Sequence, residues 1–268
     1  MTGPAQQPDE NPIIVETDGP VATIRLNRPD RLNAVSLELY RALAVALRKA
    51  SRDRSIRALV LTGTGRAFCV GADLKAHASE KRAAEWRAAY VRAAQRAAWT
   101  LHTCPKPVVA AVNGHAIGAG LELAVSCDLI VLADGAKLRF PEAALGTFVG
   151  GGVTYALAQR VGGTRARELL LLGDFFTPVQ AFEMGLANRV VPADRVVMEA
   201  RGLAERLARN APVSLEHLKN LLHRAPQVGL RATMALEAKA LIDCMSTRDW
   251  AEGVVAFREK RTPDFVGE

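Results

Sequence analysis

The fold is decided by residues 106–122, which read KPVVAAVNGHAIGAGLE. Residues 108–112 are an uninterrupted apolar run, which is typical of a strand buried on both faces of a parallel sheet. The Asn-Gly pair at 113–114 predicts a turn, and the small residues that follow lead into a short helix over 118–126. A buried strand, a turn and a helix in this order indicate an α/β fold.

The same alternation extends outward from this stretch. Strands are predicted at residues 13–17, 21–26, 58–61 and 129–132, and helices from residue 36 and over 80–101. After Pro192 only helices are predicted, over 195–210, 213–223 and 230–246, with prolines at 212 and 226 between them. We therefore predict a mobile tail over 1–12, an α/β core with the active site over 13–192, and a helical appendage over 193–268.

Composition places the chain among ordinary globular proteins. The 268 residues are 49% hydrophobic and 24% charged, so they can bury a large core and are not those of a disordered chain. The N-terminus has no apolar segment of a signal peptide, and no apolar run approaches the roughly 18–20 residues of a membrane span. The sequence thus predicts a soluble, cytoplasmic protein that does not enter a membrane.

Cysteine spacing and net charge narrow the function further. The four cysteines lie far apart and show no zinc spacing, which indicates a reducing compartment and no metal site: Cys69, Cys104, Cys127 and Cys244. The formal charge of +7 permits an anionic ligand. The basic residues between 41 and 57 and between 81 and 96 are spread along helices, so solvated helix faces are a better interpretation than a groove for nucleic acid.

Two loops could bind a ligand. The small residues at 118–120 leave backbone N–H groups at a helix start, where a phosphate or an oxyanion binds, although tight strand–helix packing gives the same pattern. The loop over 67–75 follows the strand at 58–61, and ligands of α/β sheets bind at this end of the strands. Asp73 in that loop can equally cap a helix.

Two acidic residues, Glu122 and Glu142, lie in apolar surroundings. Burial raises the pKa of a carboxyl group and suits it to general acid–base catalysis near neutral pH. The chain between them runs from the short helix through the strand at 129–132 and back, so both carboxyls can face one cavity. Placement on the polar face of a short helix remains the alternative.

Six motifs, in this order and spacing, make the chain resemble the enoyl-CoA hydratase/isomerase, or crotonase, superfamily from about residue 13 to 265. They are Leu26-Asn27-Arg28-Pro29 with Leu32-Asn33-Ala34, Ala67-Phe68-Cys69-Val70-Gly71-Ala72-Asp73-Leu74-Lys75, residues 106–122, Cys127-Asp128, Pro141-Glu142, and Ala256-Phe257-Arg258-Glu259-Lys260-Arg261.

The resemblance implies an α/β fold in which a crotonase-like spiral of ββα units carries a C-terminal helical trimerisation region. It implies a homotrimer or a dimer of trimers. It also implies an oxyanion hole formed by the backbone N–H groups of Ala72 and Ala119, the latter at a position where the family commonly has glycine.

The resemblance further implies a hydratase-like lyase that acts on an acyl-CoA thioester, with coenzyme A as part of the substrate and no separate cofactor. Glu122 would hold and activate the water, and Glu142 would handle the proton at the α-carbon. The substrate-binding residues are expected to be Arg28, Ala72, Asp73, Leu74, Lys75, Phe257 and Lys260, the last two closing over the nucleotide from the same or a neighbouring subunit.

Two alternatives remain at this stage. One is a Δ3–Δ2 enoyl-CoA isomerase or another crotonase reaction, which can work with the acid at position 142 alone. The other is a catalytically quiet RNA-binding member of the fold, against which the intact glutamate pair argues. Val149, Val153 and Tyr155 depart from the family pattern and leave the acyl specificity open.

Overall fold

The computed structural model describes residues 11–73 and 84–268. Most of the predicted N-terminal tail and the predicted contact residues Leu74 and Lys75 lie outside the described residues. The strands are β1 Ile13–Asp18, β2 Val21–Leu26, β3 Ala58–Gly63, β4 Ala67–Cys69, β5 Val108–Val112, β6 His115–Ile117, β7 Leu129–Ala133, β8 Leu138–Arg139 and β9 Arg189–Val191. The helices are α1 Leu37–Arg52, α3 Ala84–His102, α4 Ala119–Val125, α5 Val153–Leu172, α6 Pro178–Glu183, α7 Val196–Ala208, α8 Pro212–Met245 and α9 Arg248–Glu259, with short 3-10 helices η1 Pro29–Arg31, η2 Ala143–Leu145 and η3 Ala193–Arg195.

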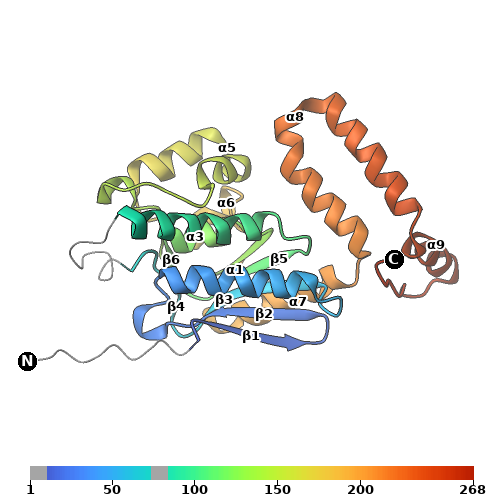
Figure 1. Cartoon of the computed structure of the whole chain (residues 1–268), viewed down its shortest axis with the longest axis horizontal. Helices are drawn as coiled ribbons and strands as arrows, with labels where there is room; N and C mark the ends of the chain where they lie inside the picture. The colour runs from blue at the N-terminus through green and yellow to red at the C-terminus, as the bar shows by residue number, and fades with distance from the viewer. Residues whose placement is uncertain (1–10, 74–83) are drawn as a thin grey trace, which may run out of the picture.

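The strands form two sheets. The larger has the order β1-β2-β3-β5-β7-β9, and the smaller has the order β4-β6-β8. Only the β1–β2 pair is antiparallel among the described strands. Each unit contributes its first strand to the large sheet and its second to the small one, and helical structure follows. The units β3-β4, β5-β6 and β7-β8 therefore form a spiral of ββα turns (Figure 1), which confirms the predicted fold class.

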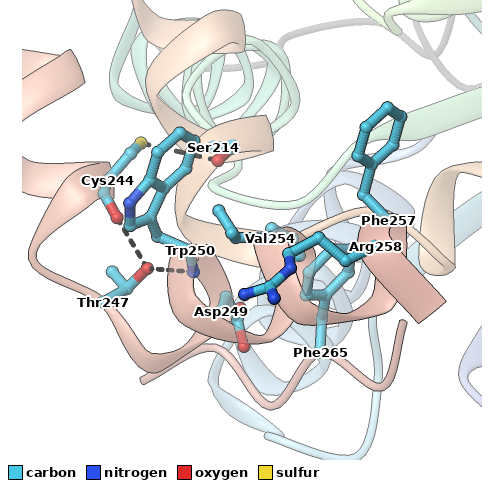
Figure 2. A pocket seen from close by; sticks show the side chains of 11 residues that line it. Ser214, Cys244, Thr247, Asp249, Trp250, Val254, Phe257, Arg258 and Phe265 are labelled. Carbon is cyan, nitrogen blue, oxygen red and sulfur yellow. Dashed lines mark hydrogen bonds between the residues drawn. The ribbon is translucent and has the colours of Figure 1, made fainter.

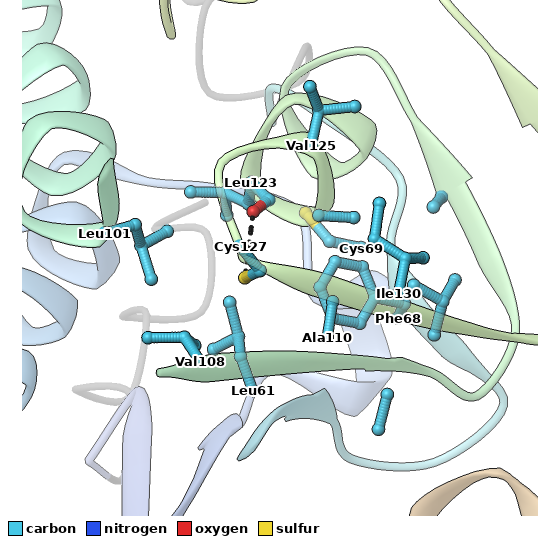
Figure 3. Packing of buried hydrophobic residues seen from close by; sticks show 14 of the residues in the cluster. Leu61, Phe68, Cys69, Leu101, Val108, Ala110, Leu123, Val125, Cys127 and Ile130 are labelled. Carbon is cyan, nitrogen blue, oxygen red and sulfur yellow. Dashed lines mark hydrogen bonds between the residues drawn. The ribbon is translucent and has the colours of Figure 1, made fainter. Parts of the chain in front are cut away.

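Apolar side chains fill the space between the two sheets. Phe68 of β4 packs in the same buried cluster as Ala110 of β5 and Ile130 of β7 (Figure 3), and its ring is fully buried. Truncation of such a ring to alanine typically costs about 3–5 kcal/mol. The apolar runs that identify the strands in the sequence thus also form the core between the two sheets.

Helix α1 shows how local sequence produces one covering element. The Ser36 side chain accepts a hydrogen bond from the Leu39 N–H and caps the helix. Tyr40, Leu43 and Leu47 repeat at helical spacing and are all buried against the core. The helix begins where the sequence predicts it, after residue 36.

The predicted appendage divides into two parts. Helix α7 packs on β3, β5 and β7 of the large sheet and buries Val196, Ala200 and Ala204, so it belongs to the core. Helices α8 and α9 extend away from the core (Figure 1). The sequence predicts a break in α8 at Pro226, but the chain turns at Gly229, where φ is 74° and ψ is 164°. No helix in the described part of the chain is long and apolar enough to span a membrane.

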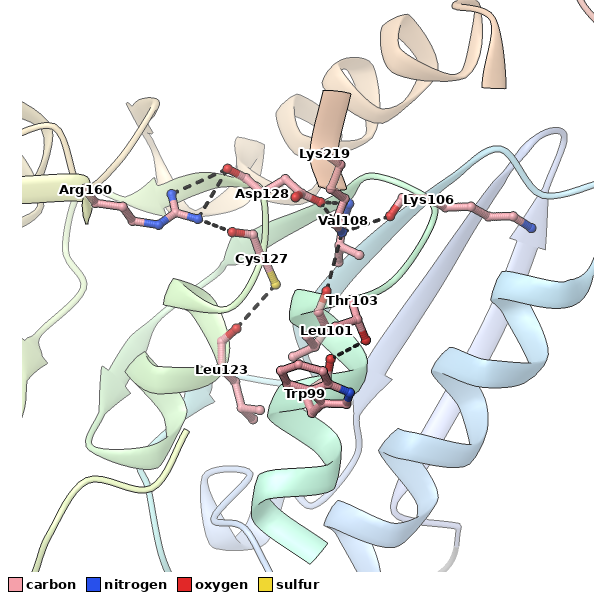
Figure 4. A network of polar contacts seen from close by, with 10 residues as sticks. All are labelled: Trp99, Leu101, Thr103, Lys106, Val108, Leu123, Cys127, Asp128, Arg160 and Lys219. Atoms are coloured by element: carbon pink, nitrogen blue, oxygen red, sulfur yellow. Dashed lines mark hydrogen bonds and ion pairs between the residues drawn. The ribbon is translucent and has the colours of Figure 1, made fainter. Parts of the chain in front are cut away.

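One polar network fixes the part of α8 that precedes Gly229 to the core (Figure 4). The Lys219 ammonium group pairs with Asp128 Oδ2 at 2.7 Å and donates to the carbonyls of Lys106 at 3.1 Å and Leu101 at 3.4 Å. The Lys219 side chain is 10% exposed, so its three donors are satisfied by protein atoms rather than by water. The network places α8 beside the C-terminal end of α3.

Candidate active site

The carboxyl edge of the small sheet gathers the candidate residues. Strands β4, β6 and β8 are parallel, so the segments that follow them, residues 70–73, 118–122 and 140–142, leave the sheet at one edge. The Gly118 N–H donates to the Arg139 carbonyl at 2.9 Å and extends the β6–β8 pairing to this edge. Sequence stretches that are far apart therefore meet here.

Two glycines let these segments touch backbone to backbone. A methyl group on Gly71 would lie 2.9 Å from the Ile117 carbonyl oxygen and 3.6 Å from the Ala119 nitrogen, and one on Gly120 would overlap the Cys69 carbonyl. Because a side chain is excluded at both positions, the segment after β4 lies directly against the start of α4. The structure thus brings the segments of Ala72 and Ala119 together.

The backbone N–H groups of Ala72 and Ala119 both point away from the hydrogen bonds that the adjacent residues make. Val35 donates to the Gly71 carbonyl at 2.8 Å and accepts from Asp73 N–H at 3.2 Å, so the intervening Ala72 N–H points to the other side of this parallel bridge. Ala119 is the first residue of α4, where an N–H has no partner within the helix. Within residues 11–73 and 84–268, neither amide donates a hydrogen bond.

Glu122 lies in the first turn of α4 and is 6% exposed. One carboxylate oxygen, Oε2, accepts from the Gly150 N–H at 2.9 Å and also from the Gly151 N–H. A side chain at Gly151 would approach that oxygen to 2.8 Å, so it would push the carboxylate out of this position. Burial raises the pKa of Glu122, and the two N–H donors oppose the increase by stabilising the ionised form.

Glu142 follows β8, and its backbone carbonyl accepts from the N–H groups of Leu145 and Thr147. Its side chain reaches Gly118, where an added methyl would lie 2.6 Å from Oε1. The buried Oε2 atom has no hydrogen-bond partner among the described residues. Burial, with a smaller contribution from the charge of Glu122, raises the pKa of Glu142 from 4.5 to about 7. The two carboxyl groups therefore interact electrostatically, but their hydrogen-bond partners differ. Glu122 Oε2 accepts from two backbone N–H groups, whereas Glu142 Oε2 has no partner among the described residues.

A cluster of aromatic side chains from α1 and α3 interacts electrostatically with Glu122. The Tyr40 and Tyr90 rings are 5.5 Å apart, and Trp86 stacks on Tyr90 at 5.3 Å. Burial raises the pKa of both tyrosines, and the charge of Glu122 contributes to each increase. The sequence places Trp86 and Tyr90 on one helix face but gives no sign that Tyr90 interacts electrostatically with Glu122.

Arg28 and Asp73 support the loop that contains Ala72. The Arg28 guanidinium donates to the Ala34 carbonyl at 2.6 Å and pairs with Asp73 Oδ2 at 3.1 Å. Both side chains are 9% exposed, so the pair is largely removed from water. Their predicted contact with substrate stays a prediction.

Phe257 and Lys260 lie at the other end of the molecule. Both belong to the α9 region, which Figure 1 shows far from β4 and β6. Phe257 is 86% exposed and lines a cavity of about 430 Å³ between α8, α9 and the C-terminal segment (Figure 2). One chain alone does not bring these residues to the glutamates, and their predicted role in closing over the nucleotide stays a prediction.

The sequence interpretation missed the donors to Glu122. The run Gly150-Gly151-Gly152 supplies two of its N–H groups to one carboxylate, and His102 in turn contacts the Gly151 carbonyl. Three consecutive glycines before a helix were the available signal, because such a run allows close backbone approach. Among the described residues, no group of three or more His, Cys, Asp or Glu side chains is arranged to hold a metal ion.

Known proteins resemble this chain in sequence and in fold. The family model for "Enoyl-CoA hydratase/isomerase" matches residues 16–268. A 2,3-dehydroadipyl-CoA hydratase from Escherichia coli is 38% identical over 95% of this chain and 98% of its own length. A crystal structure of an enoyl-CoA hydratase from Bacillus anthracis superposes with a TM-score of 0.92 at 35% identity, covering 96% of this chain and all of that one. An enoyl-CoA hydratase from a Polaromonas species gives 0.90 at 32% identity, covering 94% and 99%.

Proposed function

The chain belongs to the enoyl-CoA hydratase/isomerase family, and on that premise we propose that it adds water across the 2,3 double bond of an enoyl-CoA thioester. The observation that carries this proposal is the pair of carboxyls at one sheet edge in different environments. Glu122 accepts two backbone N–H bonds, whereas the pKa of Glu142 is raised to about 7. Hydration needs one base and one acid, and these environments supply them.

In the proposed reaction the thioester carbonyl accepts hydrogen bonds from the Ala72 and Ala119 N–H groups. Such donors stabilise the enolate that forms when water attacks the β-carbon. Ionised Glu122 takes a proton from the attacking water, and protonated Glu142 gives its proton to the α-carbon. The net change is addition of hydroxide to one carbon and of a proton to the other. The cycle closes when the proton on Glu122 returns to Glu142.

Electrostatics supports this division of roles. Burial disfavours ionisation of both carboxyls, but the Gly150 and Gly151 donors stabilise negative charge on Glu122. The Glu142 Oε2 atom has no hydrogen-bond partner among the described residues, and the pKa of Glu142 is about 7. Below that pH the carboxyl group therefore holds a proton that it can donate. The pair therefore favours a state in which Glu122 is ionised and Glu142 is neutral.

The rest of the proposed substrate site extends beyond this edge. Coenzyme A phosphates are expected near Arg28 and Lys75, with Phe257 and Lys260 supplied by a neighbouring subunit. The exposed apolar residues of α8 and α9 support burial of these helices in a trimer: Leu218, Leu222, Leu230, Leu241, Ile242, Trp250 and Phe257. Free coenzyme A should accordingly compete with substrate.

The test compares Glu122→Gln and Glu142→Gln with a control, Glu38→Gln, at an exposed position of α1. Hydration is followed as loss of the conjugated-enone absorbance with enoyl-CoA thioesters of several lengths. Each active-site variant should lose about 10²–10⁴-fold in turnover, as is typical for a general acid or base, and the control should not change.

Measurements on a 3-enoyl-CoA substrate separate the isomerase alternative. If Glu142→Gln abolishes double-bond migration while Glu122→Gln is tolerated, the enzyme is an isomerase rather than a hydratase. If neither substitution affects either reaction, the glutamates are structural. A steep salt dependence of RNA binding in an inactive protein would instead favour the RNA-binding alternative.

A further inference from the structure

His102, the last residue of α3, lies behind the glycine run that binds Glu122. Its Nε2 atom is 3.2 Å from the Gly151 carbonyl oxygen. A carbonyl oxygen only accepts hydrogen bonds, so Nε2 must carry a proton. Burial lowers the pKa of His102, which favours the neutral ring with that proton on Nε2 near pH 7. The imidazole is therefore a donor to the backbone of the site.

Gly151 is held through both of its peptide groups. Its N–H donates to Glu122 Oε2, and its carbonyl accepts from His102. Gly150, Gly151 and Gly152 are consecutive, and glycine has the largest backbone freedom of any residue. Without an anchor on the carbonyl side, this run can rotate its N–H groups away from Glu122.

The surroundings of His102 indicate that its ring does not serve only to fill the core. The ring lines a cavity of about 530 Å³ between α3, the glycine run, α5 and α8. The ring centroid of His223 in α8 lies 5.6 Å from that of His102. The Tyr155 ring of α5 meets His223 edge-on, with ring centroids 6.0 Å apart. The ring is thus half-buried beside open space, and its Gly151 bond is its specific polar contact in the described structure.

We propose that His102 is a positioning residue for hydration: by donating to the Gly151 carbonyl it holds the Gly150 and Gly151 N–H groups in register with the Glu122 carboxylate. This role rests on the proposed function, since it acts only through Glu122. It does not require His102 to touch substrate. The geometry makes the α3 C-terminus part of the catalytic apparatus.

The first test replaces His102 by leucine, which has similar bulk and no donor, and by glutamine, whose amide N–H can reach the same carbonyl. Misplacement of a catalytic group by about 1 Å costs up to roughly 10²-fold, so His102→Leu should lower kcat by about 10–10²-fold with little change in KM. His102→Gln should recover most of the rate. Thr100→Val on the same helix, which removes only a bond to the Arg96 carbonyl, is the control.

The second test is a double-mutant cycle with Glu122→Gln. If His102 acts through Glu122, His102→Leu should have little further effect on kcat in the Glu122→Gln protein. A full additional loss there, or wild-type kcat for His102→Leu in the otherwise native enzyme, overturns the positioning role. Failure of the proposed function itself is distinguished from both results, because Glu122→Gln alone would then leave hydration unchanged.

Discussion

Glu142→Gln should make the protein more stable at alkaline pH while it removes hydration. The native carboxyl is half-buried, its Oε2 atom has no partner among the described residues, and its pKa is raised from 4.5 to about 7 chiefly by burial. Ionisation is therefore harder in the folded protein than in the unfolded chain. Glutamine keeps the size of the side chain and never ionises, so it removes this cost.

The sign follows from proton binding. Between pH 4.5 and about 7 the folded protein holds a proton at Glu142 that the unfolded chain has released, so wild-type stability falls as pH rises through this window and is level above it. At about 1.4 kcal/mol per pKa unit, the interval from 4.5 to about 7 gives at most about 3.5 kcal/mol. Partial solvent exposure of the group reduces this to about 1–2 kcal/mol.

Urea unfolding of both proteins at pH 4.5 and pH 8.5, at one fixed protein concentration, measures the effect. The stability difference, variant minus wild type, should increase by about 1–2 kcal/mol between the two pH values. Any effect of the glutamine amide that does not depend on pH contributes equally at the two pH values and cancels in the comparison. An unchanged or smaller difference at pH 8.5 refutes the reasoning, because Glu142 would then ionise as easily folded as unfolded.

Four further outcomes are expected. Ala119→Pro removes one N–H at the sheet edge, so turnover should fall by about 10²–10³-fold in a protein that circular dichroism shows to be folded; full activity would contradict the oxyanion assignment. Gly118→Ala places a side chain at φ 53° and 2.6 Å from Glu142 Oε1, and should cost about 1–3 kcal/mol in urea unfolding as well as activity. Lys219→Met leaves Asp128 without its cation and should cost about 1–3 kcal/mol, read as a lower Tm. Light scattering should report a trimer or a multiple of it, and a monomer at micromolar concentration would reject the proposed assembly.

Much of the fold is readable from the sequence because each strand of the spiral is a short apolar run. The run at 108–112 becomes β5, and the run at 58–61 begins β3. Strands of two or three residues, such as β8, carry too little pattern to be recognised locally, because their formation depends on pairing with β6. The turn of α8 at Gly229 rather than Pro226 is likewise set by backbone conformation that composition does not specify.

The residues of the candidate site likewise divide into those that can be recognised in the sequence and those that cannot. Glu122 and Glu142 are visible in the sequence because acids are rare in apolar stretches. The glycine run that contains Gly150 and Gly151 indicates only close backbone approach, and His102 gives no sequence signal, since their importance comes from one carboxylate oxygen and one carbonyl that only the folded chain brings near. Backbone donors leave no mark of residue type except the glycine that allows close approach.

The asymmetry between the two glutamates follows from the backbone rather than from the carboxyls themselves. Burial raises the pKa of both, so both side chains are disfavoured as carriers of charge. The glycine run gives two N–H donors to Glu122, and the described structure gives none to the Oε2 atom of Glu142. Charge therefore settles on Glu122 and the proton on Glu142, which is the state that the proposed hydration requires at the start of each turnover. Because the isomerase alternative needs only the acid at position 142, two backbone donors to Glu122 favour the proposed hydration, and changes in the glycine run should therefore alter the reaction.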